Sequence, residues 1–482
     1  MDPNKIVEGL SRRELLALGL GAPAYAAAVP GETRQATGCK VGEMTPESAR
    51  FWLRRTAASR GLAKGIVRRG QGKAAKFLTP DTKTELLEGS APGASGYLRI
   101  TYQGGKKGAS PWVEVSEAAD YAAQFTLTGL APNTAYTYAV ETRAKRNGRV
   151  DGELTGAFRT LPVSAAPAPV NLAMLSCQMY CHMDRPDGFN IYESIQRDAP
   201  QFLLSCGDNV YYDNEDPIAN SEAVARYHWQ RMYSLPTLVK CLSQVGGYWQ
   251  KDDHDVLSDD AWPTLADRKM LPLTFANGQR IFREQVPSPP ASAPLYRTVR
   301  VGADLELWLP ESRDYRSAND DPDGPQKTIW GAEQKRWLMS SLRASDATWK
   351  VLVNPNPIVG PDRPTKNDNH ANAGFARESH EIRAFLQSNF DGNVIAVCGD
   401  RHWQYHSVDP ETGLHEFACG AASDEHAGGT PGLDPLRHKF HRVRGGYLNM
   451  EVSRNGHDCS LRMRHRDVRG ATMHEHVFQR RA

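Results

Sequence analysis

The chain has 482 residues, of which 40% are hydrophobic and 24% are charged, an ordinary composition for a globular protein. Its 58 basic and 56 acidic residues leave a formal net charge of +2, so no global basic bias points to nucleic acid or an anionic membrane. A chain of this length exceeds one compact core, and we expect two domains. Beyond the N-terminal region, no apolar run is long and charge-free enough to span a bilayer.

The N-terminal segment predicts export. Arg12 and Arg13 precede a weakly apolar stretch, Leu16 to Val29, and small residues at 24–28 fit a small-x-small cleavage pattern. Paired arginines before a mild apolar segment resemble a twin-arginine export signal, a route that carries folded proteins. We therefore expect residues 1–38 to be a signal and spacer that uses the twin-arginine export machinery, and the protein to be periplasmic or secreted. The alternative is a short buried or disordered N-terminal helix.

The eight cysteines show no zinc-finger spacing, because the pair Cys177 and Cys181 has no matching second pair. An exported chain can form disulfides, but their pairing cannot be read from the sequence. Free cysteine is often buried, so we expect most of these residues to lie in the core.

Residues 39–161 are predicted to form an all-β domain, because short runs alternate apolar and polar side chains between Gly, Pro and Asn. The stretch Leu130–Tyr138 resembles the tyrosine-corner region of a fibronectin type III or immunoglobulin-like sandwich. A stiff segment, Pro162–Pro169, follows and marks the expected domain boundary. The alternating runs are 49–54, 98–102, 125–127 and 136–140.

Residues 170–482 read as an α/β domain, since short apolar runs alternate with segments of helical spacing. This pattern predicts a sheet with helices on its faces. Alternating residues on both sides of Asn455-Gly456 predict a closing hairpin. The apolar runs are 171–176, 201–205, 350–353 and 393–397, and the helical segments are centred on 191–195, 337–342 and 382–390.

Polar residues that can bind a metal follow the ends of these apolar runs. In open α/β sheets, ligands bind beyond the carboxyl ends of the strands. Carboxylates crowded there without a cation would repel one another. Each fragment alone is more often a turn, a cap or a core thiol, but their common place after strands predicts a metal centre. The fragments are Ser176-Cys177-Gln178, Gly207–Tyr212, Asp252–Asp255, Asn354–Asn356 and Gly399–His402.

At these residues the sequence resembles the alkaline phosphatase D (PhoD-like) family of the calcineurin-like metallophosphoesterase superfamily. The resemblance runs from about residue 39 to the end of the chain. It implies a two-sheet α/β/β/α core and an N-terminal all-β domain of immunoglobulin or fibronectin-III type. The motifs that carry it are Ser-Cys-Gln at 176–178, Gly-Asp-x-x-Tyr at 207–211, Asp-Asp-His-Asp at 252–255 and Gly-Asp-Arg-His at 399–402, supported by 311–316 and 330–334.

The resemblance implies a pair of unlike metal ions. Cys177 as thiolate, Tyr211 as phenolate and His402 would bind Fe(3+). Asp208 would bridge to a second site that holds Ca(2+), and Asp253 would be a ligand there. The donor chemistry agrees, because thiolate, phenolate and imidazole suit a transition metal and oxygen ligands suit a hard cation, although other divalent pairs stay open.

The remaining site residues are assigned in the same way. Asp400 would bind the second metal, and His254 would be the catalytic residue that contacts the phosphate or leaving group. Arg401 could bind phosphate, since guanidinium matches phosphate geometry, or it could point away from the site. Asn354 is a candidate last ligand with a turn role as the alternative. For the loop at Asn369-His370, a solvated surface position is favoured over a place at the substrate entrance.

The predicted activity is hydrolysis of phosphomonoesters, phosphodiesters or both, by direct attack of metal-activated hydroxide. No Asp-Ser-Ala nucleophile stretch of the zinc alkaline phosphatases is apparent, so no covalent phosphoenzyme is expected. Small phosphate esters are the expected substrates, with nucleic acid or teichoic-type diesters left open. The alternatives are a purple acid phosphatase-like enzyme, which would want His-rich ligand motifs, and a non-catalytic surface protein that binds through its β domain.

Overall fold

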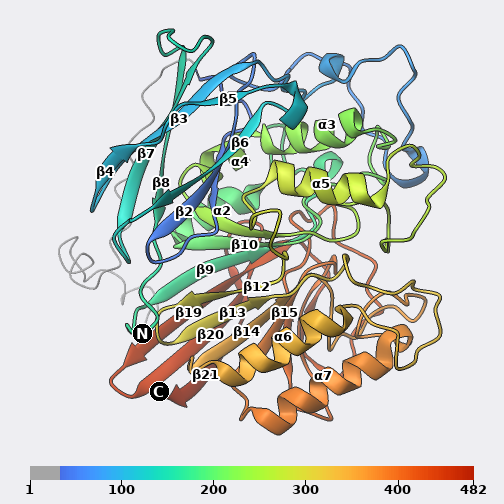
Figure 1. The fold of residues 1–482 in the computed structure, drawn as a ribbon. Helices are drawn as coiled ribbons and strands as arrows, with labels where there is room; N and C mark the ends of the chain where they lie inside the picture. The colour runs from blue at the N-terminus through green and yellow to red at the C-terminus, as the bar shows by residue number, and fades with distance from the viewer. Residues whose placement is uncertain (1–32) are drawn as a thin grey trace, which may run out of the picture.

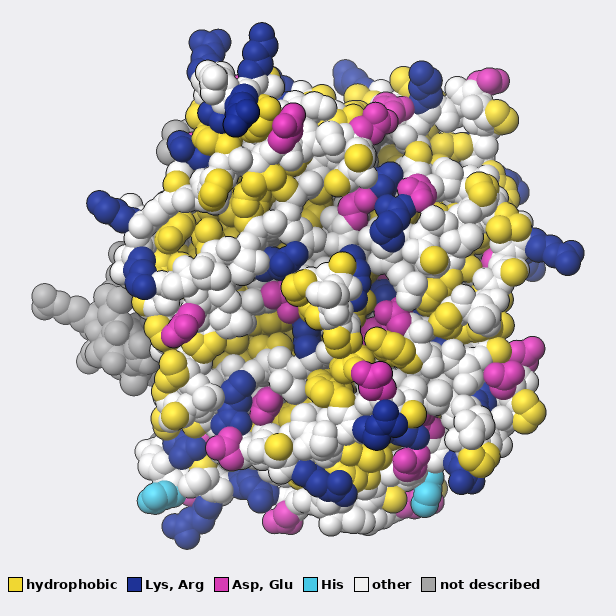
Figure 2. Space-filling model, in the orientation of Figure 1, with side chains coloured by type: hydrophobic (Ala, Val, Ile, Leu, Met, Phe, Trp, Pro, Cys, Tyr) yellow, Lys and Arg dark blue, Asp and Glu magenta, His cyan; other side chains and the backbone are white. Residues whose placement is uncertain are grey.

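The computed structural model describes residues 33–482, so the paired arginines and the cleavage pattern of the predicted export signal lie outside the described residues. Within residues 33–482 the strands form three sheets, and the two larger ones lie against each other in the middle of the molecule (Figure 1). None of the helices in this part combines the length and apolar character needed to cross a membrane. Basic and acidic side chains are interspersed over the face shown in Figure 2, in keeping with the small net charge.

The first large sheet has a parallel centre of four strands with antiparallel strands on both sides. Because the parallel strands are buried on both faces, they read as continuous apolar runs rather than as alternating ones. In spatial order, the sheet contains β21 (Thr472–Arg481), β20 (Asp458–Asp467), β19 (Gly446–Asn455), β9 (Val170–Leu175), β10 (Phe202–Cys206), β11 (Gly246–Gln250), β1 (Cys39–Gly42), β2 (Ser48–Arg54) and β6 (Ala122–Thr128).

The second large sheet packs face to face on the first. Its centre is also parallel, and antiparallel strands again close both edges. In spatial order it contains β12 (Arg297–Val301), β13 (Leu305–Leu309), β14 (Trp349–Asn354), β15 (Val394–Cys398), β17 (His415–Ala418), β16 (Gln404–Val408) and β18 (His438–Arg442).

Helices cover the outer faces of both large sheets, and three apolar clusters fill the spaces between the layers. The outer face of the first sheet carries α2 (Asn190–Asp198), α3 (Glu222–Tyr233), α4 (Pro236–Leu242) and α5 (Phe275–Gln285). The second sheet is covered by α6 (Gly331–Ala344) and α7 (Ala376–Asn389), at the bottom of Figure 1. This α/β/β/α order confirms the predicted fold class. Short 3₁₀ helices are η2 (Gly72–Ala74), η3 (Thr84–Leu86), η4 (Glu117–Ala119), η5 (Tyr180–His182) and η6 (Ala373–Phe375).

The predicted N-terminal β domain is present as two packed antiparallel layers. The ring of Phe51 in one layer meets Tyr138 and Phe158 of the other at centroid distances of 5.1 and 5.3 Å. The tyrosine corner forms as its sequence suggests, because the Tyr136 hydroxyl accepts a hydrogen bond of 2.8 Å from Ala131 N. The second layer contains β4 (Lys107–Ala109), β3 (Gly96–Gln103), β7 (Ala135–Arg143) and β8 (Gly152–Arg159), with β5 (Val113–Val115) paired to β3.

One layer of this domain is continuous with the first large sheet, a feature that the sequence pattern does not reveal. Strand β1 pairs in parallel with β11 at Gly42 and Gly247. The pairing covers β11, which would otherwise be an open sheet edge with unpaired backbone groups. At the other end of the sheet, the predicted hairpin around Asn455-Gly456 is confirmed as β19 and β20, and β21 adds a further strand.

Candidate metal centre

Three predicted ligands occupy equivalent places in the fold. Cys177, Asp208 and Asp400 each stand two residues beyond the end of a parallel strand, β9, β10 and β15. All three have left-handed backbone conformations, with φ of 55°, 53° and 61°. Such conformations are costly for residues other than glycine and cluster at functional sites. The left-handed backbone at these three strand ends therefore points to a functional role for the residues there.

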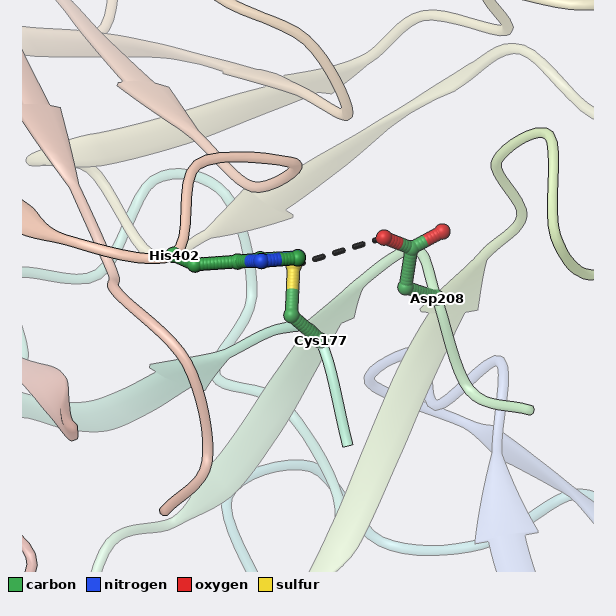
Figure 3. Close-up of side chains that lie close together, drawn as sticks. All are labelled: Cys177, Asp208 and His402. Carbon is green, nitrogen blue, oxygen red and sulfur yellow. Dashed lines mark hydrogen bonds between the residues drawn. The ribbon is translucent and has the colours of Figure 1, made fainter. Parts of the chain in front are cut away.

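The first group of ligand atoms joins Cys177, Asp208 and His402, whose donor atoms lie within 4.8 Å of one another (Figure 3). Cys177 Sγ is 3.4 Å from Asp208 Oδ2. The Tyr211 hydroxyl donates to the same carboxylate oxygen at 3.1 Å and lies 3.4 Å from His402 Nε2. The structure thus brings together the four side chains that the sequence predicts as a transition-metal site.

The second group joins Asp208, Asp253 and His254 within the same limit. Asp208 therefore belongs to both groups, which places two candidate sites side by side with one shared carboxylate. Asp208 Oδ1 is buried without a hydrogen-bond partner among the described residues, and Asp253 Oδ1 has no hydrogen bond but lies 3.4 Å from the Arg313 guanidinium. Leaving a buried carboxylate oxygen such as Asp208 Oδ1 unpaired is costly, so this atom fits a site that holds cations.

The electrostatics of the pair also fit a cation. Burial, followed by repulsion from Asp253, raises the pKa of Asp208 well above its usual value. Burial and the Asp208 charge raise the pKa values of Cys177 and Tyr211 in the same way. Burial lowers the pKa of His402, which favours the neutral ring. A bound metal ion would reverse the first three shifts, because thiolate, phenolate and carboxylate are the forms that bind metals.

Buried cations support the second group from outside. Burial alone raises the pKa of Asp253, but Arg313 and His254 outweigh it and the net shift is strongly downward. Burial lowers the pKa of His254, yet the carboxylates of Asp213 and Asp253 turn the net shift well upward. His254 Nδ1 is 2.6 Å from Asp213 Oδ1, a contact that fixes the orientation of the ring.

Asp400 and Arg401 take no part in these two groups of ligand atoms. The Asp400 carboxylate pairs with the Arg401 guanidinium, and Asp400 is in neither group of converging ligand atoms among residues 33–482. Arg401 is fully buried and also forms a 2.6 Å ion pair with Asp362. The backbone position of Asp400 matches that of the other strand-end ligands, but its side chain is engaged by the neighbouring arginine.

The structure also bears on the predictions made for Asn354 and for the loop at Asn369-His370. The Asn354 side chain accepts a hydrogen bond from Trp330 Nε1 at 3.3 Å and donates one to the Asn356 carbonyl. These bonds fit the turn role that was the alternative to metal binding. The solvated-surface hypothesis for Asn369-His370 is wrong, because both side chains are buried. His370 Nε2 lies 3.0 Å from Glu378 Oε2, and this hydrogen-bond partner explains how a polar loop segment can enter the interior.

Sequence reasoning missed three residues of the centre. His426 Nε2 lies 3.0 Å from the Tyr211 hydroxyl, and its ring is 4.0 Å from that of His402. It stands in an irregular loop without a recognisable pattern. Asp213 follows the Gly-Asp-x-x-Tyr motif by two residues. Arg313 lies in the supporting motif at 311–316, which gave a signal of importance but no role.

The two-sheet fold and the paired ligand groups at its strand ends are those of a metallophosphoesterase. The chain belongs to the PhoD-like phosphatase family, whose model matches residues 172–444. It is 22% identical over 324 residues to alkaline phosphatase D of Bacillus subtilis (strain 168), a match that covers 57% of this chain and 52% of the relative. The chain thus spans about half the length of this curated relative.

Solved structures agree with the fold. A structure of PhoD superposes with a TM-score of 0.70 at 17% identity and covers 94% of this chain and 90% of that chain. The purple acid phosphatase PPD1 from yellow lupin (Lupinus luteus) gives a TM-score of 0.60 at 11% identity, with 93% of this chain and 74% of that chain covered. At these identities the likeness establishes the architecture, including the β-rich N-terminal part.

Proposed function

We propose that the protein is a metal-dependent phosphoesterase that hydrolyses phosphomonoesters, phosphodiesters or both. One observation carries the proposal: Asp208 is shared by two buried groups of ligand atoms, so that two cations fit side by side at the strand ends. Membership of the PhoD-like phosphatase family supports phosphate esters as substrates. Metals bound there supply an activated water and a clamp on phosphate oxygens.

The two groups differ in chemistry, which supports unlike metals. Cys177, Tyr211 and His402 offer sulfur, phenol and imidazole donors around the shared Asp208, a set suited to ferric iron. Asp253 adds carboxylate oxygen to the second group, which suits a hard cation such as calcium. In this assignment Asp400 would reach the second ion only if its carboxylate left Arg401.

His254 is the group that we assign to the leaving alkoxide. Asp213 holds its Nδ1 at 2.6 Å, which leaves Nε2 to donate a proton or stabilise charge beside the second site. The His254 ring packs at a tilt against Tyr211, with 4.4 Å between the ring centroids, so its position is coupled to the first site as well. The Arg401 guanidinium already forms ion pairs with Asp362 and Asp400. It could therefore bind phosphate only beside these two carboxylates.

The test combines elemental analysis of purified protein with turnover of chromogenic phosphate monoesters and diesters. We expect two metal ions per chain and activity that chelation removes and metal restores. Asp208→Ala should lose bound metal and turnover together, while Asp391→Asn, at an almost fully exposed carboxylate, should keep both. A pure, folded preparation that carries no metal, gains none and turns over no ester would refute the proposal.

Two observations bear on the alternatives. The layer β1-β2-β6 of the N-terminal domain is part of the core sheet, which disfavours a β module that works alone as a binding protein. The first ligand group includes the thiol of Cys177 and is not made of carboxylates and imidazoles alone. This difference favours a PhoD-like enzyme over a purple acid phosphatase-like enzyme. Comparing mononucleotides, diesters and polymeric phosphodiesters as substrates would define the natural class.

Export by the twin-arginine route is part of the proposal and rests on Arg12 and Arg13. Replacing both by lysine should leave the precursor inside the cell, whereas the wild-type chain should appear, shortened, in the periplasm or medium. Equal distribution of the two proteins would argue against this route without affecting the proposed chemistry.

A further inference from the structure

A second cluster of imidazoles lies at the C-terminal edge of the two-sheet core, away from the metal centre. Seven of the chain's 15 histidines belong to the strands of this edge. The rings of His406 and His465 contact Phe417 of the core between the two large sheets, where aliphatic side chains would be usual. The seven are His406, His415, His438, His441, His465, His474 and His476.

Four of these rings form a compact group that joins both sheets. His406 on β16 and His415 on β17 come from the second sheet, whereas His474 and His476 come from β21 of the first. The ring of His406 lies at centroid distances of 5.1, 5.2 and 4.9 Å from His415, His474 and His476. His415 and His476 are 5.3 Å apart.

The nitrogens of this group bond to one another. His406 Nε2 lies 2.9 Å from His415 Nδ1, and His406 Nδ1 lies 3.0 Å from His474 Nε2. Phe417 stacks on His406, and Phe478 packs edge-on against His415, so the surroundings are apolar. Such a shell leaves the ring nitrogens as the dominant polar atoms of this half-buried group.

The protonation state keeps lone pairs available. Burial, followed by repulsion from neighbouring imidazoles, lowers the pKa of His406 well below its usual value and that of His415 to about 4. The charged neighbours that act on His415 are His476 and Lys439, and His474 responds to burial and His476. Neutral imidazole is the form that binds transition metals.

We propose that His406, His415 and His476 form a second, independent site for a borderline transition metal ion of the Zn²⁺ type, with His474 as the positioning residue. In this site His406 binds through Nε2 while its Nδ1 keeps the bond to His474, the usual arrangement of a ligating histidine and its outer partner.

The spacing fits such an ion. Tetrahedral zinc, with Zn–N bonds of about 2.0–2.1 Å, places bound nitrogens about 3.3 Å apart and ring centroids about 5 Å apart. The observed 2.9 Å between His406 Nε2 and His415 Nδ1 and the centroid distances of 4.9–5.3 Å are close to these values. Within residues 33–482 the nitrogens of all three rings do not yet converge within 4.8 Å, so the site needs a movement of His476. The ion would take the place of the hydrogen bond between His406 and His415, and the proton of that bond would move to the other nitrogen of its own ring. The His476 ring would rotate to complete the triad. Binding needs neutral rings and therefore weakens on acidification.

The experiment uses full-length protein without a polyhistidine tag and with its phosphoesterase centre already loaded. Calorimetric titration with Zn²⁺ should show one further equivalent, and Co²⁺ should give the visible absorption of a tetrahedral site. His415→Gln and His476→Gln, both at half-buried positions, should each weaken binding at least tenfold with turnover unchanged. His474→Gln should weaken it less.

His441→Gln is the matched control, because this ring lies at the same edge but bonds Thr430 Oγ1 at 2.8 Å. It should bind Zn²⁺ as the wild type does. Asp208→Ala should keep the extra equivalent, which separates this site from the proposed catalytic centre. Absence of a further equivalent, or an equal loss in His441→Gln, would overturn the proposal.

Discussion

Arg313 Nη2 lies 3.4 Å from Asp253 Oδ1, and both side chains are buried. The same guanidinium pairs through Nε with Asp252, so one buried cation holds two successive carboxylates of the Asp-Asp-His-Asp motif. Asp252 also accepts from Asn356 at 2.7 Å, which locks its own carboxylate away from the ligand groups. The two neighbouring aspartates therefore have different roles: Asp252 anchors the loop, and Asp253 faces the second site.

Arg313→Met should weaken metal binding about 10–100-fold, the usual cost of losing an outer partner of a ligand. It should also lower the free energy of unfolding by about 3–5 kcal/mol, because two buried carboxylates lose their counter-ion. Metal titration and denaturant unfolding measure the two effects. Arg313→Lys keeps the charge but loses the two-pronged guanidinium, so its metal affinity and stability should fall between those of wild type and Arg313→Met. If Arg313→Met is as stable as wild type and binds metal as tightly, this role is contradicted.

Asp208→Asn should abolish the stabilisation that metal gives the wild type. Without metal, burial and Asp253 disfavour the Asp208 charge, so the neutral amide should equal or exceed wild-type stability by about 1 kcal/mol. With metal, wild type should gain stability that the variant lacks, since only the native state binds the ions. Thermal unfolding with chelator and with added metal checks both arms. A variant that is less stable than wild type in chelator would show that Asp208 serves the apo fold instead.

Much of the fold was readable from local patterns, because buried parallel strands and two-face alternation leave direct signatures. The runs at 171–176 and 393–397 became β9 and β15, and the turn at Asn455-Gly456 closed the predicted hairpin. The pairing of β1 with β11 was not readable, since it joins strands about two hundred residues apart through two glycines. Sequence periodicity reports which face of a strand is buried, but not which neighbour it pairs with.

The candidate site shows a similar division. Cys177, Asp208 and His402 were predictable because each follows a strand end, and strand ends of a parallel sheet meet at one edge. His426 and Asp213 were not, because they enter from irregular loops whose path depends on tertiary packing. Asp400 shows the limit of position as evidence: its backbone matches the other ligands, yet the adjacent Arg401 takes its carboxylate.

Cys177→Ser should change the visible spectrum of the iron-loaded protein if the thiolate is a ligand. Its Sγ lies beside Asp208 in the first group, and a hydroxyl is a far weaker donor to ferric iron. Tyr211→Phe serves as the partner variant, because phenolate gives its own absorption. Loss of different bands in the two variants is expected, and unchanged spectra in both would place the iron elsewhere.

Tyr136→Phe should destabilise the N-terminal domain by about 1–2 kcal/mol, because Ala131 N loses its buried acceptor at 2.8 Å. The stacked contact with Phe158 at 5.3 Å is kept, so the change isolates the hydrogen bond. Denaturant unfolding measures the difference. Tyr102→Phe, whose ring lies against Tyr136 at 6.2 Å, is the matched control and should be near wild type.

The histidines at the C-terminal edge of the two-sheet core predict that the folded protein loses stability in acid. Burial, followed by repulsion from His474, lowers the pKa of His465 from 6.5 to about 3. The unfolded chain therefore binds the proton more readily between these values, so stability rises with pH across that window and is lost as the pH falls through it. One buried group should cost about 2 kcal/mol between roughly pH 6.5 and pH 4.5. His465→Gln should flatten this slope in denaturant unfolding with chelator present, while His380→Gln at an exposed position should not. Parallel slopes for wild type and His465→Gln would show that other groups set the acid limit.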